Sequence, residues 1–387
     1  MQATVATLRF RSSPGMKAHY EVLDGLRGTA AISVVIFHIL EMTTPDWAHN
    51  PLHHAYLAVD FFFALSGFVV GYAYDQRRAK GAPPKIALTF GQFVQRRLIR
   101  LHPVVIVAAT AGLLGYLFDP FVGTAQTVGI AISPAKLALI YALSLFLLPT
   151  PVLPNTFGET HSINGPSWTL FLEYVANLLY GLFGHLLKRR LHIALCIAAA
   201  AGLIATAMHF PQLGWGWDWK TMWVGYVRLA YPFLTGLLLY RLNLKLRVPQ
   251  PYVVCSLLLV AVFATPTMGR FTSLYEASCV IFVFPVILMM GAGVEKIAGR
   301  LGALCRFTGQ LSYPLYIIHY PLIYMFGHWV WSTHPAGQTR DLVAVGLFAT
   351  EITIATVLLY AYDLPVRAWL TKVLIDGRRQ RVPAAAE

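Results

Sequence analysis

Long apolar stretches alternate with short polar connections along almost the whole chain of 387 residues. Ten of these stretches approach the roughly 20 residues that a helix needs to cross the hydrocarbon core of a bilayer. They lie at residues 27–44, 55–74, 100–118, 166–187, 191–210, 223–240, 250–266, 275–294, 311–331 and 341–363. The pattern predicts an all-α integral membrane protein, a bundle of about ten transmembrane helices.

An eleventh apolar stretch, at 136–149, is too short to span and predicts a re-entrant or interfacial helix. If it does not cross, 25 of the 30 lysines and arginines fall on one side of the membrane. They lie in segments 1–27, 77–100, 188–190, 241–247, 296–306 and 367–381. Because short basic segments stay in the cytoplasm, we expect both termini to be cytoplasmic.

Composition supports a membrane protein, since 57% of residues are hydrophobic and only 12% are charged, against about 25% charged in globular domains. The formal charge is +13. The basic residues behind it cluster in the connections between apolar segments, as expected for residues that set membrane topology, so we expect no nucleic-acid partner. The cysteines stand singly within or beside apolar stretches, which argues against disulfides and a metal site. They are Cys196, Cys255, Cys279 and Cys305.

Ionisable residues inside the predicted spans are the functional candidates, because each is costly in hydrocarbon and needs a polar partner or a wet cavity. A structural hydrogen bond between helices is the alternative explanation for any one of them. The set is His38, Asp60, Glu173, Arg228, Glu276, His319 and Glu351.

The stretch "LDGLRGTAAISVVIFH" places Arg27 and His38 eleven residues apart in the first span. At 3.6 residues per turn they share a helix face, about 16 Å apart. Arg27 is therefore expected at the cytoplasmic mouth and His38 near the middle of the bilayer.

Two carboxylates have a suggestive context. Asp60 precedes Gly67 and Gly71, whose small-residue face lets another helix approach closely. Glu173 and Asn177 share a face at a spacing of four, and a carboxylate there could orient an imidazole.

Two further features carry two interpretations each. Arg97 and Arg100 in "QRRLIRLHP" either anchor the topology or form a paired guanidinium site for phosphate. The tryptophans of "FPQLGWGWDWK" either anchor the chain at the membrane boundary, which is the default, or stack on sugar rings.

Five motifs, in the same order, resemble the acyltransferase-3 family of integral-membrane acyltransferases. They are "LDGLRGTAAISVVIFH", "AVDFFFALSGFVVGY", "RRLIRLHP", "PSWTLFLEYVANLLY" and "LSYPLYIIHYPLI". The resemblance implies a ten-helix domain at 19–363, between cytoplasmic tails at 1–18 and 364–387. It also implies transfer of an acyl group, commonly acetyl, from cytoplasmic acyl-CoA to a hydroxyl of a sugar or other acceptor, without a bound cofactor.

By this resemblance His38 matches the essential histidine, Arg27 its partner arginine, and Arg97 and Arg100 a pair that binds acyl-CoA. His38 is then expected to act as a general base, with Glu173 or Asp60 holding its tautomer. A covalent acyl-enzyme intermediate is the alternative.

The remaining candidates are assigned supporting or acceptor-side roles. His319 matches a recurrent family motif, and we favour a supporting role over a catalytic one. Arg228 either binds the acceptor or pairs with Glu276 or Glu351. Three residues complete the set: Tyr316, Asn177 and Trp168.

We expect an inner-membrane enzyme whose acceptor is a carbohydrate or a lipid-linked glycan. A transporter or flippase of a glycan is the alternative, with the buried charges lining a path through the membrane.

Overall fold

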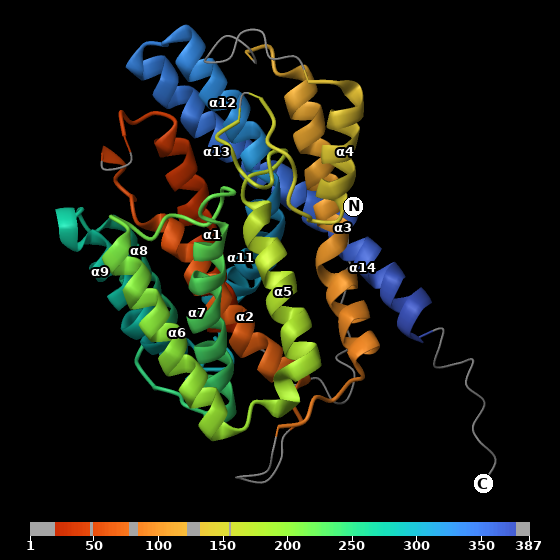
Figure 1. Ribbon diagram of the computed structural model, residues 1–387, viewed down its shortest axis with the longest axis vertical. Coiled ribbons are helices and arrows are strands. Elements are labelled where there is room, and N and C mark those ends of the chain that lie inside the picture. Colours follow the sequence, from red (N-terminus) through yellow and green to blue (C-terminus); the bar gives the residue numbers. More distant parts are fainter. Residues whose placement is uncertain (1–19, 47–48, 77–83, 122–131, 155, 377–387) are drawn as a thin grey trace, which may run out of the picture.

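The computed structural model describes residues 20–46, 49–76, 84–121, 132–154 and 156–376, and helices dominate them (Figure 1). The α-helices are α1 (Glu21–Glu41), α2 (Ala58–Tyr74), α3 (Phe90–Phe118), α4 (Pro134–Leu145), α5 (Ser167–Phe183), α6 (Arg189–His209), α7 (Met222–Leu242), α8 (Pro251–Ala264), α9 (Thr272–Ser278), α10 (Phe284–Gly291), α11 (Gly299–Ile318), α12 (Tyr320–Thr333), α13 (Gly337–Leu358) and α14 (Leu364–Thr371). The 3-10 helices are η2 (Ala55–Leu57), η3 (Gly184–Leu186) and η4 (Gly269–Phe271). The π-helical segments are η5 (Cys279–Val283), η6 (Leu359–Asp363) and η7 (Lys372–Asp376).

Within the described residues, seven helical segments are long and apolar enough to cross a membrane. They are Glu21–Glu41, Ala55–Tyr74, Phe90–Phe118, Arg189–His209, Met222–Leu242, Gly269–Gly291 and Gly337–Asp376. Of the other predicted spans, α5 and α8 have 17 and 14 residues. The all-helical membrane class is confirmed, whereas the count of ten stays a prediction.

Several element boundaries differ from those predicted; α3, for example, begins at Phe90 and not at residue 100. The expected span at 311–331 is divided at His319 into α11 and α12, and α11 begins earlier, at Gly299. The first turns of α11 carry Arg306, which pairs with Glu21 at 2.6 Å. Most of the basic segment 296–306, predicted as a connection, is therefore helical. The last helix also continues beyond 363 as far as Asp376. The predicted tail at 1–18 lies outside the described residues.

The basic connections meet at one end of the bundle, which we call the basic end (residues 184–190, 241–247 and 293–306). Arg241 bonds Asp75 at 2.7 Å and the carbonyl of Gly184 at 3.0 Å. Lys245 pairs with Glu295 at 3.5 Å. The charge pattern and the packing therefore agree on which connections lie together, and the cytoplasmic location of this end stays a prediction.

Helix α4 does not traverse the bundle. It lies beside α3 (Figure 1), with the hydroxyls of Thr110 and Tyr141 2.9 Å apart. The described residues on either side of the segment, Asp119 and Thr150, both lie at the end opposite the basic end, where they contact His328 and Trp219. We call this the loop end (residues 42–54, 150–165 and 210–221). That α4 is a re-entrant or interfacial helix stays a prediction.

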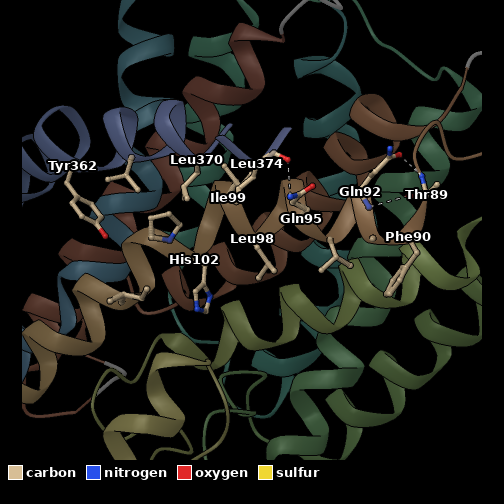
Figure 2. Close-up of a pocket in the computed structure, with 15 residues that line it drawn as sticks. Thr89, Phe90, Gln92, Gln95, Leu98, Ile99, His102, Tyr362, Leu370 and Leu374 are labelled. Carbon is tan, nitrogen blue, oxygen red and sulfur yellow. Dashed lines mark hydrogen bonds between the residues drawn. The ribbon is translucent and has the colours of Figure 1, made fainter. Parts of the chain in front are cut away.

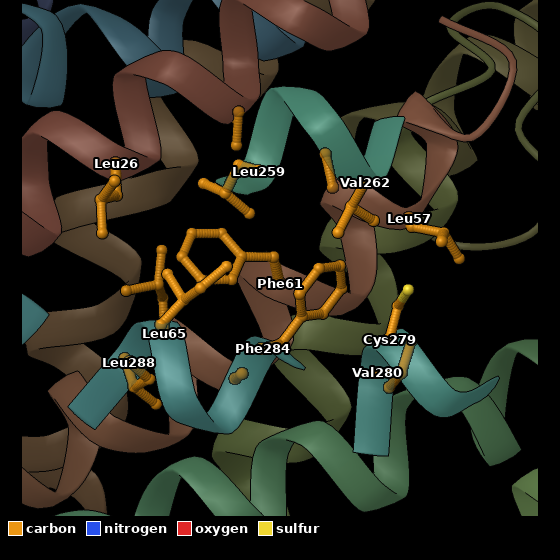
Figure 3. Close-up of a cluster of buried hydrophobic side chains, with 14 of the residues drawn as sticks. Leu26, Leu57, Phe61, Leu65, Leu259, Val262, Cys279, Val280, Phe284 and Leu288 are labelled. Carbon is orange, nitrogen blue, oxygen red and sulfur yellow. The ribbon is translucent and has the colours of Figure 1, made fainter. Parts of the chain in front are cut away.

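Helices α2 and α7 pack backbone against backbone. A Cβ on Gly67 would lie 2.0 Å from the Phe233 carbonyl oxygen, and one on Gly236 1.9 Å from that of Ala64. Only glycine fits at these two positions, so the small-residue face of α2 has α7 as its partner. Beside this contact, side chains of α1, α2, α8 and α10 form an apolar core around Phe61 and Phe284 (Figure 3).

Candidate functional site

A cavity of about 330 Å³ opens at the loop end of the bundle, above the apolar core. Its wall combines α1, α7, the α11–α12 junction and the two loops at 150–165 and 210–221. The polar and aromatic lining residues are Phe37, His38, Glu41, Tyr56, Phe157, Glu159, Trp168, Gln212, Trp215, Trp217, Arg228, Tyr316, Tyr320 and Trp331. Several of the predicted site residues therefore meet in one cavity.

His38 reaches this cavity from α1 and is held by a carboxylate of the same helix. Its Nδ1 lies 3.0 Å from Oε2 of Glu41, one turn later. When Nδ1 carries the proton and donates it to that oxygen, Nε2 keeps its lone pair for another proton. The side chain of His38 is 18% exposed, so the imidazole can reach a ligand without being bathed in solvent.

His319 lies directly behind His38. The two imidazole rings stack with centroids 5.5 Å apart, and Tyr320 meets His38 edge-on at 4.9 Å. His319 is fully buried, and neither ring nitrogen has a well-aligned hydrogen-bond partner among the described residues. His38 lines the cavity and His319 does not, and the supporting role of His319 stays a prediction.

The two carboxylates predicted to orient His38 lie elsewhere. Glu173 pairs with Arg97 at 2.6 Å and accepts a hydrogen bond from Ser66 at 3.1 Å. Asp60 pairs with Arg228 at 2.6 Å. The expectation that either one bonds the imidazole is corrected by Glu41, because the α2–α7 packing directs Asp60 toward α7.

Arg228 is buried and tied into the cavity wall. Besides Asp60, it donates to the carbonyls of Trp215 at 2.9 Å and Tyr56 at 3.2 Å, and its guanidinium lies 5.7 Å from the ring centre of Trp168. The alternative pairings are wrong. Glu276 instead accepts from His54 at 2.8 Å and from Tyr56.

Glu351, the other expected partner of Arg228, is fully buried and has no hydrogen-bond partner within the described part of the chain. Tyr316 shares a hydrogen bond of 2.9 Å with Thr169. Asn177 donates to the carbonyl of Glu173 at 2.6 Å, within its own helix. Asn177 is therefore not among the cavity residues.

The three predicted donor-binding arginines lie together, away from the cavity and toward the basic end. Arg27 donates to Ser312 at 2.9 Å and to the Gly309 carbonyl at 2.5 Å. Arg97 is held by Glu173, and Arg100 lies within electrostatic range of both other arginines. Among the described residues, the side chain of Arg100 makes no hydrogen bond or ion pair.

The three tryptophans of the 210–221 loop do not all fit the same interpretation, membrane anchoring or contact with a ligand. Trp215 and Trp217 line the cavity with ring centroids 6.3 Å apart and planes 16° apart. Trp219 is 53% exposed and donates to the carbonyl of Thr150. Two of the indoles are thus placed to meet a ligand, and the third lies at the surface.

Two acidic cavity residues were missed from the sequence. Glu41 could have been found, because it lies one turn after His38 on the same predicted helix. Glu159 carries no such signal, since it sits in a polar loop and is buried only by tertiary contacts. Burial raises the pKa of Glu159 to about 7. Within the described residues, no group of three His, Cys, Asp or Glu side chains converges to hold a metal ion.

A larger, mostly apolar groove of about 770 Å³ runs between α3 and α14 (Figure 2). It begins at the α3 N-terminus, where Thr89 and Gln92 form a capping box. It ends near Leu374, whose carbonyl accepts a bond from Gln95. Ile99, His102 and Tyr362 also line it. None of the predicted catalytic residues belongs to this groove, so it is separate from the candidate site.

Comparison with known proteins gives related chains but no related structure. Residues 20–361 match a family model described as "Acyltransferase domain". A Rhizobium radiobacter protein named "Protein 2 in picA locus" is 32% identical over 193 residues, 49% of this chain and 95% of that relative. A Streptomyces mycarofaciens protein named "Acyltransferase MdmB" is 26% identical over 399 residues, covering 94% of each chain. No solved structure is significantly similar.

Proposed function

Because this chain belongs to the acyltransferase family whose model it matches, we propose that it transfers an acyl group, acetyl in the simplest case, from cytoplasmic acyl-CoA to a hydroxyl of a sugar, glycan or glycosylated acceptor. The class of enzyme follows from the family, and the donor, the acceptor and the residue roles are our proposal. A transporter without transferase chemistry, the alternative from the sequence, does not fit an acyltransferase family.

The observation that carries the proposal is the His38–Glu41 pair at the cavity wall. In the proposed step, Nε2 of His38 removes the proton of the acceptor hydroxyl while the oxygen attacks the thioester carbonyl. The carbon–sulfur bond breaks, and the departing CoA thiolate takes the proton from the imidazolium. Glu41 stabilises the positive imidazolium between these two transfers.

The arginine cluster supports a donor site at the basic end. Phosphates of acyl-CoA are bound best by guanidinium groups, and Arg100 lies within electrostatic range of Arg27 and Arg97. Since Arg27 and His38 are about 16 Å apart along one helix, the donor would extend its thioester arm through the bundle toward His38. The acceptor would then enter from the loop end.

Loss of thioester from acetyl-CoA tests the proposal directly. Purified protein, given a panel of hydroxylated acceptors, should release CoA thiol and acylate at least one of them. His38→Ala should lower the rate by at least about 100-fold, within the range for loss of a general base. His319→Ala, the matched control, should keep more activity. A reversed order of the two variants, or transport without loss of thioester, would contradict the proposal.

A further inference from the structure

The two loops over the cavity are joined at one point. The backbone N–H of Thr160 donates to the carbonyl of Trp217 at 2.8 Å, and the Thr160 hydroxyl donates to the same oxygen at 3.0 Å. The neighbouring residues Glu159 and Asp218 form an isolated antiparallel bridge. The carboxyl of Glu159 and the indole of Trp217 therefore belong to one wall and line the same cavity.

The Glu159 carboxyl is only half satisfied. Its Oε1 accepts a hydrogen bond of 2.7 Å from the hydroxyl of Tyr324. Its Oε2 is buried and has no well-aligned hydrogen-bond donor in the described part of the chain, although the Thr156 hydroxyl and the Phe157 backbone lie nearby. A buried acceptor without a donor is costly, and a ligand hydroxyl would remove that cost.

The charges around the cavity leave a negative balance. Its titratable acidic and basic side chains are His38, Glu41, Glu159 and Arg228. Arg228 is neutralised by Asp60 at 2.6 Å. Glu41 is shared with His38, whereas no cation bonds Glu159 among the described residues. The cavity therefore repels an anionic group and tolerates a neutral or cationic one.

Trp215 and Trp217 supply the complementary surface. Their nearly parallel rings face the same cavity as the carboxyl, and an aromatic face beside a hydrogen-bond acceptor suits a ring that is apolar on its faces and carries hydroxyls at its edge. Such a ring can stack on an indole while one hydroxyl donates to a carboxylate.

We propose that Oε2 of Glu159 binds a hydroxyl or ammonium group of the acceptor, whose ring stacks on the Trp215–Trp217 surface. The acceptor ring is accordingly a neutral or cationic sugar and not an acidic one. This inference rests on the proposed function, because it names the substrate class of the same cavity. Glu159 binds and orients the acceptor, and the proton transfer remains with His38.

A matched pair of ligands tests the charge preference. Methyl β-D-glucopyranoside and methyl β-D-glucuronide differ only at C6, which is a hydroxymethyl group in one and a carboxylate in the other. Tryptophan fluorescence of the purified protein at pH 8 reports binding of each up to about 100 mM. We expect the glucoside to bind at least about tenfold more tightly, equivalent to about 1.4 kcal/mol.

Variants separate a binding role from a structural one. Glu159→Gln keeps the size of the side chain, removes its charge and should bring the affinity ratio of the two sugars close to one. Tyr324→Phe removes the donor to Oε1 but keeps the carboxylate, so the ratio should persist. Glu295→Gln, at the basic end, is the matched control and should leave the ratio unchanged. If Glu159→Gln only disturbed the structure, it would weaken the binding of both sugars and preserve their affinity ratio.

Two results would overturn the inference: neither sugar binds, or Glu159→Gln keeps the preference of the unmodified protein. Thiol release from acetyl-CoA, measured on the same samples, distinguishes this failure from failure of the proposed function. Thiol release without a sugar preference refutes only the acceptor assignment. A sugar preference that depends on Glu159, in a protein that never consumes acetyl-CoA, supports the binding site and refutes the transfer.

Discussion

The carboxylate of Glu41 lies 3.0 Å from Nδ1 of His38, three residues earlier on the same helix. Both partners of the dyad are therefore placed by the local geometry of α1 and do not depend on how that helix packs. The carboxylates of Asp60 and Glu173, on other helices, pair with Arg228 and Arg97 instead.

Replacing Glu41 by Gln should slow acyl transfer without weakening the binding of the acyl donor. We expect kcat to fall about 10- to 100-fold, because the imidazolium loses its charge partner, while KM for acetyl-CoA stays unchanged. Steady-state thiol release measures both constants. Glu41→Asp should recover part of the rate. An unchanged kcat in Glu41→Gln would show that the dyad has no part in proton transfer.

The Arg97–Arg100 pair should bind the phosphates of the donor. Lys at either position should restore binding only in part, since the planar guanidinium fork is lost, and added salt should weaken affinity. Calorimetric titration with acetyl-CoA measures this. Arg300→Ala, an exposed basic-end residue, is the control. If the double variant Arg97→Ala, Arg100→Ala binds acetyl-CoA normally, the pair only anchors the topology.

The Asp60–Arg228 pair should be a large contributor to stability. Asp60→Asn leaves a buried guanidinium without its counter-charge and is expected to cost about 3–5 kcal/mol of unfolding free energy, seen as a lower Tm in detergent. Asp341→Asn, whose side chain is 66% exposed and pairs with Arg340, should change that free energy by less than about 1 kcal/mol. Equal Tm changes in the two variants would contradict the assignment.

Glu159 should make the protein less stable as pH rises. Its folded pKa of about 7 lies above the ordinary value of 4.5, so between these pH values the native state binds more protons than the unfolded state. The free energy of unfolding therefore falls from pH 4.5 to 7, by about 3 kcal/mol in total, and levels off above. Tm measured from pH 5 to 8 should show this fall, and Glu159→Gln should flatten it. A wild-type slope that survives in the variant must come from another group.

The two ends of the bundle should face opposite sides of the membrane. In protein whose four buried cysteines are replaced by alanine, a single cysteine at Lys220 or Asp341 should react with an impermeant thiol reagent from outside the cell. One at Arg189 or Arg300 should react only in inverted vesicles. Labelling of Lys220 and Arg189 from the same side would show that the re-entrant assignment of the 136–149 stretch is wrong.

Local properties of the sequence were sufficient for the membrane class, most of the helices and the placement of His38 above Arg27. A long apolar run predicts a helix by itself, because backbone polar groups in hydrocarbon must be hydrogen-bonded, and a helix satisfies them within the same segment. The re-entrant or interfacial placement that the length of the 136–149 stretch indicates stays a prediction. Some boundaries were not predicted, and the start of α11 involves a distant partner, because Glu21 neutralises Arg306.

Only the tertiary structure decided which charges pair. Several carboxylates and arginines have similar sequence contexts, and their partners depend on which helices touch. Asp60 meets Arg228 because Gly67 and Gly236 allow α2 and α7 to approach until backbone contacts backbone. Glu159 is buried in the cavity only because the Thr160–Trp217 hydrogen bonds join two loops more than 50 residues apart in the chain. Such contacts depend on distances across the bundle, and residue spacing along one segment carries no information about them.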